Sequence, residues 1–331
     1  MRRRLLIIMS RLALFGFMVL MRGSSILENG ISPTATMRLT ATPVQLDAHD
    51  PTRVQVGQLT YEGGWILHAD VPQFGGISSL SVEGDHFTGL SDTGAVATWR
   101  FDGRDQPTEA HIKPLPPGCL FGVDKSDRDS ESMVHDMVSG RIWVGLEDRS
   151  RVCRYAPDFA RVEAMNIVPQ MKHWDKNGGP ESMVRLSDGR FIIIAEDKPR
   201  NEASRPLLIF DRDPTDPAVH VTKMYYDPPD DYSVSDMGQL PDGRIVVLNR
   251  TFDAPLYLFR VIVSIIEPFA VKPGGHVKSR VIARFDPPVV TDNYEALTIT
   301  TEHGVPIFWI MSDDNYMDFQ RTYLLKFAFK D

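Results

Sequence analysis

The stretch ESMVRLSDGRFIIIAED, residues 181–197, has the pattern of a β-hairpin with an acidic residue at each end. Asp188-Gly189 between apolar runs is a strong signal for a tight hairpin turn. Residues 191–194 are aromatic and β-branched, which favours a strand. Because the first residue of one antiparallel strand lies beside the last residue of its partner, Glu181 and Glu196 are expected at the same end of the hairpin.

The same pattern occurs five times, so the chain is read as a repeat protein. The units begin at residues 78, 131, 181, 235 and 295, which gives a repeat of 50 to 60 residues. Two further strand-like runs follow the hairpin, such as residues 96–101 and 109–115 in the first unit. Four strands per unit, without a long helical pattern, predict an all-β fold, a β-propeller of four-stranded antiparallel blades.

The number of blades is predicted as six, with five as the alternative. Five units are evident, and a sixth could be assembled from residues 53–68 and the last strand, 321–329. That assembly would close the ring with both ends of the chain. Residues 23–50 are rich in Ser, Thr and Pro and are expected to be a linker, so the propeller is placed at residues 51–331.

The first 22 residues have the pattern of a signal peptide or a membrane anchor. Arg2-Arg3-Arg4 precedes apolar residues at 5–9 and 12–21, interrupted by Arg11. Residues 5–21 just reach the lower limit of about 17 residues for a membrane span. The protein is therefore expected to be exported, either into the periplasm or anchored facing it, with no other contact with the membrane.

Two cysteines, Cys119 and Cys153, occur in the chain. An exported protein permits a disulfide between them. No spacing pattern supports pairing, however, so two buried free thiols are the favoured interpretation.

The charge of the chain argues against a nucleic-acid partner. The net charge is −8, and residues 1–22 hold five Arg and no acid, so the rest carries 31 basic against 44 acidic residues. Binding of nucleic acid requires a basic surface. An acidic body is compatible with cation binding. The sequence also lacks HExxH, P-loop, GxGxxG and GxSxG patterns.

In every unit the turn lies midway between two polar residues, so the polar ends of all the hairpins are expected around one mouth of the channel. These residues are Asp92, Glu131, Glu147, Glu181, Glu196, Asp236, Asn249, Glu295, Asp313 and Asp314. Crowded carboxylates must protonate, pair with Arg or Lys, or bind cations. Hard oxygen ligands in this number suit Ca²⁺ best. Capping between blades and structural ion pairs are the alternative interpretation.

Several of these segments resemble the phytase-like family with esterase-like activity. They are residues 74–80 with 90–94, 179–182, 293–297, and 312–316 followed by 320–322. The resemblance covers about residues 55–331 and implies a β-propeller in which recurrent Glu and Asp residues carry phosphoester hydrolysis. The positions that transfer by resemblance are Asp92, Glu131, Glu181, Glu196, Glu295 and Asp314. The fourth unit departs from the pattern, with Ser235-Asp236 in place of Glu-Ser and Asn249-Arg250 in place of an acid pair.

The resulting hypothesis is a calcium-dependent hydrolase of small phosphoric esters. The expected catalytic residues are Glu131, Glu181, Glu295 and Arg250, and the expected cation ligands are Asp92, Glu181, Glu196, Glu295 and Asp314. Glu131 could serve as a ligand or as a general base, and Arg250 and Lys198 could contact phosphate oxygens.

Two alternatives remain open from the sequence. One is a lactone or carboxylic ester hydrolase on the same metal, for which Asn249 would be a suitable neutral ligand. The other is a non-catalytic propeller that binds a ligand or partner, with purely structural calcium.

Overall fold

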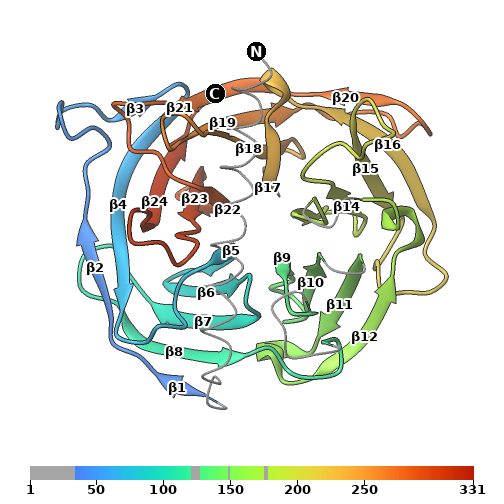
Figure 1. Cartoon of the computed structure of the whole chain (residues 1–331), viewed down its shortest axis with the longest axis horizontal. Coiled ribbons are helices and arrows are strands. Elements are labelled where there is room, and N and C mark those ends of the chain that lie inside the picture. The colour runs from blue at the N-terminus through green and yellow to red at the C-terminus, as the bar shows by residue number, and fades with distance from the viewer. Residues whose placement is uncertain (1–33, 121–126, 148–149, 175–177) are drawn as a thin grey trace.

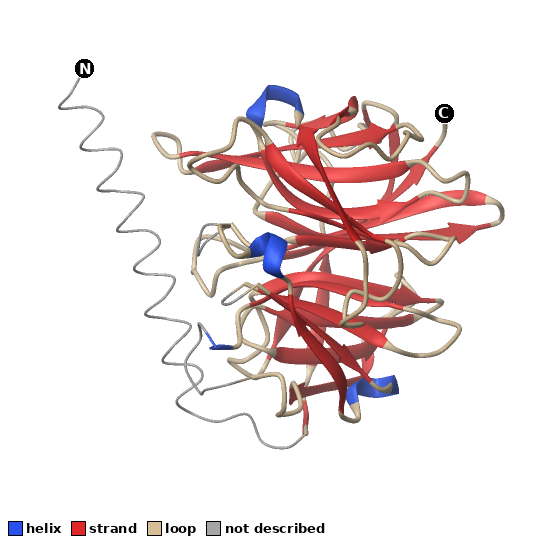
Figure 2. Cartoon of the chain, turned by 90° about the vertical axis from the view of Figure 1, so that its right-hand side faces the viewer, coloured by secondary structure: helices blue, strands red, loops and turns tan. Residues whose placement is uncertain are grey.

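The computed structural model describes residues 34–120, 127–147, 150–174 and 178–331. Five sheets surround a central axis as the blades of a propeller (Figure 1). Seen from the side, strands make up most of the described chain (Figure 2). The predicted all-β propeller is therefore confirmed, with five blades, the alternative number. The expected leader, residues 1–22, and residues 23–33 of the expected linker lie outside the described residues.

Each blade has four or more strands, ordered from the axis outward. Blade 1 holds β5 (Ile77–Glu83), β6 (His86–Ser91), β7 (Ala95–Arg100), β8 (Thr108–Pro114) and β1 (Ala35–Thr36); blade 2 holds β9 (Ser130–His135), β10 (Ile142–Leu146), β11 (Arg151–Tyr155) and β12 (Val162–Ile167); blade 3 holds β13 (Ser182–Arg185), β14 (Phe191–Ile194), β15 (Arg205–Phe210), β16 (Val221–Asp227) and β20 (His276–Lys278). Blade 4 holds β17 (Ser233–Gln239), β18 (Ile245–Asp253), β19 (Leu258–Ile266) and β21 (Arg280–Phe285); blade 5 holds β22 (Tyr294–Glu302), β23 (Val305–Ser312), β24 (Thr322–Phe329), β4 (Leu59–Ala69) and β2 (Leu39–Pro43), and β3 (Gln55–Val56) pairs with β4. Short 3₁₀ turns at Pro157–Phe159, Pro169–Met171 and Pro229–Asp231 lie in the connections.

Both ends of the chain build blade 5, which closes the ring. The C-terminal strands β22, β23 and β24 supply three strands, and β4 pairs antiparallel with β24 as the fourth. The segment expected to form a sixth blade therefore completes the fifth, because β24 has no other outer partner. Residues 35–43, within the expected linker, add edge strands to blades 1 and 5 instead.

The hydrophobic core is divided among the interfaces between neighbouring blades. In the described residues, one buried apolar cluster fills each of the five interfaces. In β14, Phe191 and Ile193 face blade 2, and Ile192 and Ile194 face blade 4. Successive side chains of a strand point to opposite faces, and both faces are buried here, so the strand is apolar throughout.

A disulfide joins Cys119 and Cys153, so the expectation of two free thiols is wrong. Cys153 lies in β11, and Cys119 lies in the connection from blade 1 to blade 2, with their Cα atoms 6.3 Å apart. That separation is within the range that a disulfide spans. The buried Arg151 donates a hydrogen bond to the carbonyl oxygen of Cys119. Within the described ranges, no helix is long and apolar enough to cross a bilayer.

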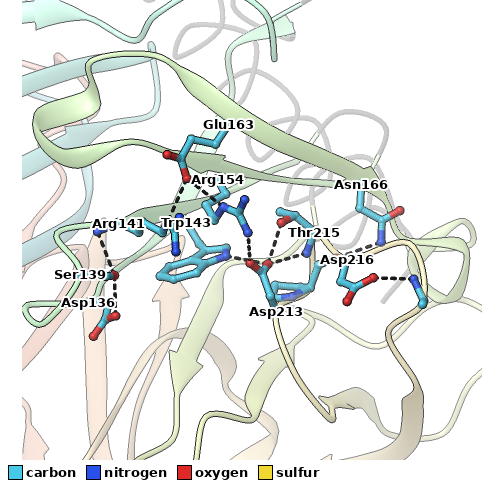
Figure 3. A network of polar contacts seen from close by, with 12 residues as sticks. Asp136, Ser139, Arg141, Trp143, Arg154, Glu163, Asn166, Asp213, Thr215 and Asp216 are labelled. Carbon is cyan, nitrogen blue, oxygen red and sulfur yellow. Dashed lines mark hydrogen bonds and ion pairs between the residues drawn. The ribbon is translucent and has the colours of Figure 1, made fainter.

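Polar contacts centred on Asp213 join the outer parts of blades 2 and 3 (Figure 3). The Asp213 carboxylate, in the β15–β16 connection, accepts hydrogen bonds from Trp143 Nε1 at 2.8 Å and from Arg154 Nη1. It also accepts from the backbone and hydroxyl of Thr215, at 2.8 and 2.7 Å. Arg154 in turn contacts Glu163 at 3.2 Å. The network therefore links blade 2 to blade 3, and the Asp213 carboxylate is the acceptor for the donors of Trp143 and Arg154.

Replacing Asp213 by Ala is expected to destabilise the propeller by about 2–3 kcal/mol, because the Trp143 and Arg154 donors lose their acceptor. The thermal midpoint followed by circular dichroism should fall by several degrees. Arg212→Ala is the matched control, since Arg212 is exposed and pairs with its neighbour Asp211, and it should change stability by less than about 0.5 kcal/mol. Equal melting of the two variants would contradict the structural role of Asp213.

Candidate functional site

A one-residue bulge in four of the five inner hairpins places equivalent residues at the mouth of the channel. The register of the inner hairpin skips Ser78 in blade 1, Glu131 in blade 2, Ser235 in blade 4 and Glu295 in blade 5. In blade 3, Glu181 stands directly before the paired residue Ser182. A bulged residue is released from the hydrogen-bonded ladder, so its side chain can be re-aimed.

A second set of equivalent residues follows the second strand of each hairpin. In four blades, this residue donates its backbone N–H to the carbonyl oxygen of the residue that lies two positions before Ser78, Glu131, Glu181 or Glu295. These hydrogen bonds run from Asp92 to Gly76 (2.8 Å), from Glu147 to Asp129 (2.9 Å), from Glu196 to Gly179 (3.3 Å) and from Asp313 to Asn293 (2.9 Å). In blade 4 the residue paired with Ser233 at this place is Arg250. Arg250, not the predicted Asn249, is therefore the blade 4 counterpart of these acids.

These ten positions form what we call the mouth ring: Ser78, Asp92, Glu131, Glu147, Glu181, Glu196, Ser235, Arg250, Glu295 and Asp313. Seven are carboxylic acids and one is basic, and all seven acids are largely buried. The structure thus brings together the predicted residues Asp92, Glu131, Glu147, Glu181, Glu196, Arg250, Glu295 and Asp313.

Arg250 is the single basic member of the mouth ring. Its Nη2 lies 2.9 Å from Glu295 Oε1 and 3.2 Å from Glu196 Oε1. Burial alone would lower the pKa of Arg250, but the negative charges of the surrounding acids outweigh burial and raise it. One guanidinium therefore offsets part of the charge on the side of blades 3 to 5.

The acids of blade 2 lie close together. Carboxylate oxygens of Asp129, Glu131 and Glu147 all lie within 4.8 Å of one another. This group is the one in the described chain whose spacing fits a shared metal ion. Asp129 was not among the residues predicted from the sequence, although its position two residues before Glu131 matches that of Asn293 before Glu295.

Four residues singled out from the sequence are held in other contacts. Asp236 accepts hydrogen bonds from the backbone of Met237 (2.8 Å) and of Leu297 in blade 5 (2.7 Å), so it links two blades. The amide of Asn249 is buried and bonded to Tyr226, Ser264 and two carbonyls. Asp314 accepts from Gly76, Tyr316 and Thr322 at 3.0–3.1 Å, and Lys198 pairs with Asp231 at 2.6 Å.

Comparison with known proteins identifies the family. A family model described as phytase-like, with esterase-like activity of phytase, matches residues 72–316. The chain belongs to this phytase-like family. The resemblance found in the sequence is thereby confirmed. No curated protein matches the chain.

Several solved structures are similar to this phytase-like propeller in fold. A luciferin-regenerating enzyme shows 12% identity and a TM-score of 0.41, covering 88% of this chain and 98% of its own. An endo-arabinase from Bacteroides thetaiotaomicron shows 6% identity and a TM-score of 0.49, covering 79% and 96%. A putative 6-phosphogluconolactonase from Bacteroides fragilis shows 8% identity and a TM-score of 0.41, covering 86% and 80%. Because the identities and TM-scores are this low, we infer nothing about activity from these structures.

An apolar ring lies below the acids of the phytase-like propeller. Two positions after each bulge stand Leu80, Met133, Met183, Met237 and Leu297, all buried. They line a cavity of about 280 Å³ on the other side of this ring, formed by all five inner strands. The acids therefore stand on an apolar floor, which disfavours their ionised forms.

Burial dominates the electrostatics of the mouth ring. It raises the pKa values of Glu131, Glu147 and Glu181 well above the usual value, and the neighbouring carboxylates raise them further. Burial also raises the pKa of Glu196, to about 7, although Arg250 opposes the shift. Without a bound cation, Glu196 therefore titrates near neutral pH, and Glu131, Glu147 and Glu181 hold protons more tightly than ordinary carboxyls.

The raised pKa values predict how stability depends on pH in the presence of a chelator. These acids bind protons more tightly in the folded chain than in the unfolded chain, where the pKa is near 4.5. Their contribution is fully present below that value and is lost as the pH rises through the folded pKa, about 7 for Glu196. The thermal midpoint should therefore fall between about pH 5.5 and about pH 8. A midpoint that rises over this range would contradict the shifts.

Two substitutions that each remove a carboxylate charge from the mouth ring are expected to shift the thermal midpoint in opposite directions. Glu131→Gln removes a repelling buried carboxylate and should raise the thermal midpoint in chelator at about pH 8 by a few degrees. Glu295→Gln removes the partner that lies 2.9 Å from Arg250 and should lower the midpoint. Melting curves of both variants beside the unaltered protein check this, and shifts of the same sign would refute the proposed charge distribution.

Proposed function

We propose that this protein is an exported, calcium-dependent hydrolase of small phosphoric esters, with its site at the mouth ring. The observation that carries the proposal is the gathering of seven largely buried carboxylates at one mouth of the channel, where Arg250 is the one basic residue among the ten mouth ring positions. Membership of the phytase-like family supports an ester hydrolase. Export and the phosphate specificity rest on the leader pattern and on the charge of the site.

The residues of blade 2 fit calcium best. Asp129, Glu131 and Glu147 bring three hard oxygen donors within 4.8 Å of one another. Glu181 and Glu196 of blade 3 are adjacent, since their charges act on Glu131 and Glu147, respectively. We assign the triad as ligands with Glu181 and Glu196 beside it. Asp314 is left out of this set, because its carboxylate accepts three hydrogen bonds.

Bound calcium would offset the negative charge of these carboxylates and of an incoming phosphate, and would polarise a phosphoryl oxygen. Arg250 is placed to donate hydrogen bonds to phosphate oxygens, and its pairing with Glu196 and Glu295 holds the guanidinium at the mouth. Glu181 lies beside the triad, and burial raises its pKa, so that its carboxylate is a stronger base than an ordinary one; we assign it to take the proton from water. Water then adds to phosphorus, the bond to the ester oxygen breaks, and the alcohol leaves after taking a proton from solvent.

The structure bears differently on the two alternative functions that the sequence left open. The lactonase or carboxylesterase variant relied on Asn249 as a neutral ligand, and the buried amide of Asn249 is already committed to four hydrogen-bonding groups. A non-catalytic binding propeller would keep the same acids for structural calcium. The activity test below separates it from a hydrolase.

Purified protein should hydrolyse aryl phosphate mono- or diesters with calcium, and lose that activity with a chelator. Glu181→Gln should reduce kcat by about 100-fold or more, because it removes the proton acceptor. Arg250→Ala should raise KM as well, because a phosphate-binding group is lost. Arg190→Ala is the matched control, since Arg190 pairs with Asp188 at the opposite end of the same hairpin and should leave the kinetics unchanged.

Lactones tested in parallel would identify a carboxylic ester hydrolase. Absence of turnover on every substrate, or turnover that does not respond to chelator, would refute the proposed function.

A further inference from the structure

A row of polar side chains crosses the face of blade 1 that is turned toward blade 2. Ser81 in β5 pairs with Thr88 in β6, and Thr88 pairs with Thr98 in β7. Thr98 in turn pairs with His111 in β8. Side chains paired across antiparallel strands share one face of the sheet. Thr88 lies two residues before Leu90, which belongs to the cluster between blades 1 and 2, so the row faces blade 2.

The matching row of blade 3 is apolar. Val184 pairs with Ile192, and Ile192 pairs with Ile209, in the same order of strands. All three are buried in the cluster between blades 3 and 4. Val184 stands three residues after the first mouth ring position of its hairpin, as Ser81 does in blade 1. Blade 1 therefore carries hydroxyls where blade 3 carries core side chains, and such a departure from the pattern that favours stability is expected at a functional site.

A cavity of about 430 Å³ lies over the polar row. We call it the blade 1–2 cleft, and its polar lining includes Ser81, Thr88, Thr98, His111, His135 and Asp158. Ser81 Oγ lies 3.3 Å from Nδ1 of His135 in blade 2, and Lys113 Nζ donates to the carbonyl oxygen of Asp158. These two contacts tie blade 1 to blade 2 beside the cleft. Its volume is within the range of about 300–1,000 Å³ that is usual for small-molecule sites.

The side chains inside the blade 1–2 cleft can both donate and accept hydrogen bonds. Thr88 and Thr98 are half-buried, and their hydroxyls have no hydrogen-bond partner among the described residues. Burial lowers the pKa of His135, so its imidazole is neutral at neutral pH, with one nitrogen as donor and the other as acceptor. An apolar ligand would leave these groups without partners, which is costly. A ligand with hydroxyl groups would satisfy them.

The charges at the rim of the blade 1–2 cleft disfavour an anion. Arg100, the one arginine in its lining, has Nη1 2.8 Å from Asp85 and Nε 3.2 Å from Glu109. Its charge is therefore already paired. Glu83 at the rim can only accept hydrogen bonds when it is ionised, which suits the hydroxyls of a ligand. No group of described residues in this lining has the spacing of a metal site.

We infer that the blade 1–2 cleft binds a neutral sugar, either free or at the end of a glycan. The cleft lies at the opposite end of the β5–β6 hairpin from the mouth ring, because Glu83 and His86 flank the hairpin turn. None of its lining residues belongs to the mouth ring. The inference therefore goes beyond the proposed function and requires no cation.

Saturation-transfer NMR on the full chain tests the inference with glucose, galactose, mannose, xylose, maltose, cellobiose and lactose. At least one of these sugars should bind with a Kd of about 1 mM, which is ordinary for a ligand of this size. A glycan array detects a sugar that binds only at the end of a longer chain. Absence of binding to every sugar of the panel and of the array would overturn the inference.

Removing two hydroxyls locates the site. Thr88→Val and Thr98→Val combined should raise the Kd of the bound sugar by about 10-fold or more, because the side-chain shape is kept while two hydrogen-bonding groups are lost. Thr222→Val is the matched control, since Thr222 pairs with Ile209 in blade 3 and should leave binding unchanged. Equal affinity in the double variant and the control would contradict a sugar site in this cleft.

Histidine NMR signals of the unaltered protein give a readout that does not depend on whether a variant folds. The imidazole signals of His111 and His135 should shift when the bound sugar is added. The signal of His220, in the β15–β16 connection of blade 3, should not shift. Shifts that leave His111 and His135 unaffected would place the sugar elsewhere and overturn the inference.

These outcomes separate the inference from the proposed function. Sugar binding should be the same with and without chelator, and binding that requires calcium would place the sugar at the mouth ring instead. Sugar binding without ester hydrolysis would refute the hydrolase and leave the cleft as assigned. Ester hydrolysis without sugar binding would refute the cleft and leave the hydrolase standing.

Discussion

The register shift in the inner hairpins is the constraint on which the mouth of this propeller depends. Each shift takes one residue, such as Glu131 or Glu295, out of the ladder while the flanking backbone stays paired. The side chain is released at the point where five sheets converge on the axis. Because closure through β4 and β24 fixes the blade spacing, the acids have little freedom to move apart. Their mutual repulsion is therefore built into the fold.

The charge around the mouth is distributed unevenly. Blade 4 contributes Ser235 and Arg250 to the mouth ring and no acid, and Arg250 pairs with Glu196 and Glu295 from its two neighbours. Blade 2 contributes Asp129, Glu131 and Glu147 and is two blades away from that guanidinium. The apolar floor at Met133 and its equivalents amplifies the imbalance, because it lowers the local dielectric constant. A cation-binding mouth is the outcome that this imbalance favours.

Much of the fold could be predicted, because each repeat is recognised from short stretches of neighbouring residues. Turn pairs such as Asp188-Gly189, and apolar runs such as residues 191–194, are consequences of hairpin geometry and burial on two faces. The blade count could not be predicted in the same way. Whether residues 59–69 begin a sixth sheet or complete the fifth depends on pairing with β24, which lies at the other end of the chain.

The candidate site, like the fold, could be predicted in part from the sequence. Midpoint arithmetic across each hairpin brought Glu131, Glu181, Glu196 and Glu295 to one mouth, because antiparallel pairing makes that geometry local. It misassigned the fourth blade by one residue, because the pairs Asp236–Asn249 and Ser235–Arg250 share one midpoint, and the strand register puts Arg250 where Asn249 was expected. It also overlooked Asp129, whose importance comes from a contact with Glu147 across the hairpin.

The amino-acid sequence alone therefore determined the hairpin repeat, the propeller class and the end of each hairpin at which the acids lie, because these follow from short-range patterns of turns and alternation. Tertiary structure alone decided the five-bladed closure, the Cys119–Cys153 bond and the separation of the acids that pair with Arg250 from the acidic cluster of blade 2. Those features depend on distances between residues far apart in the chain, which only the packing of the blades sets.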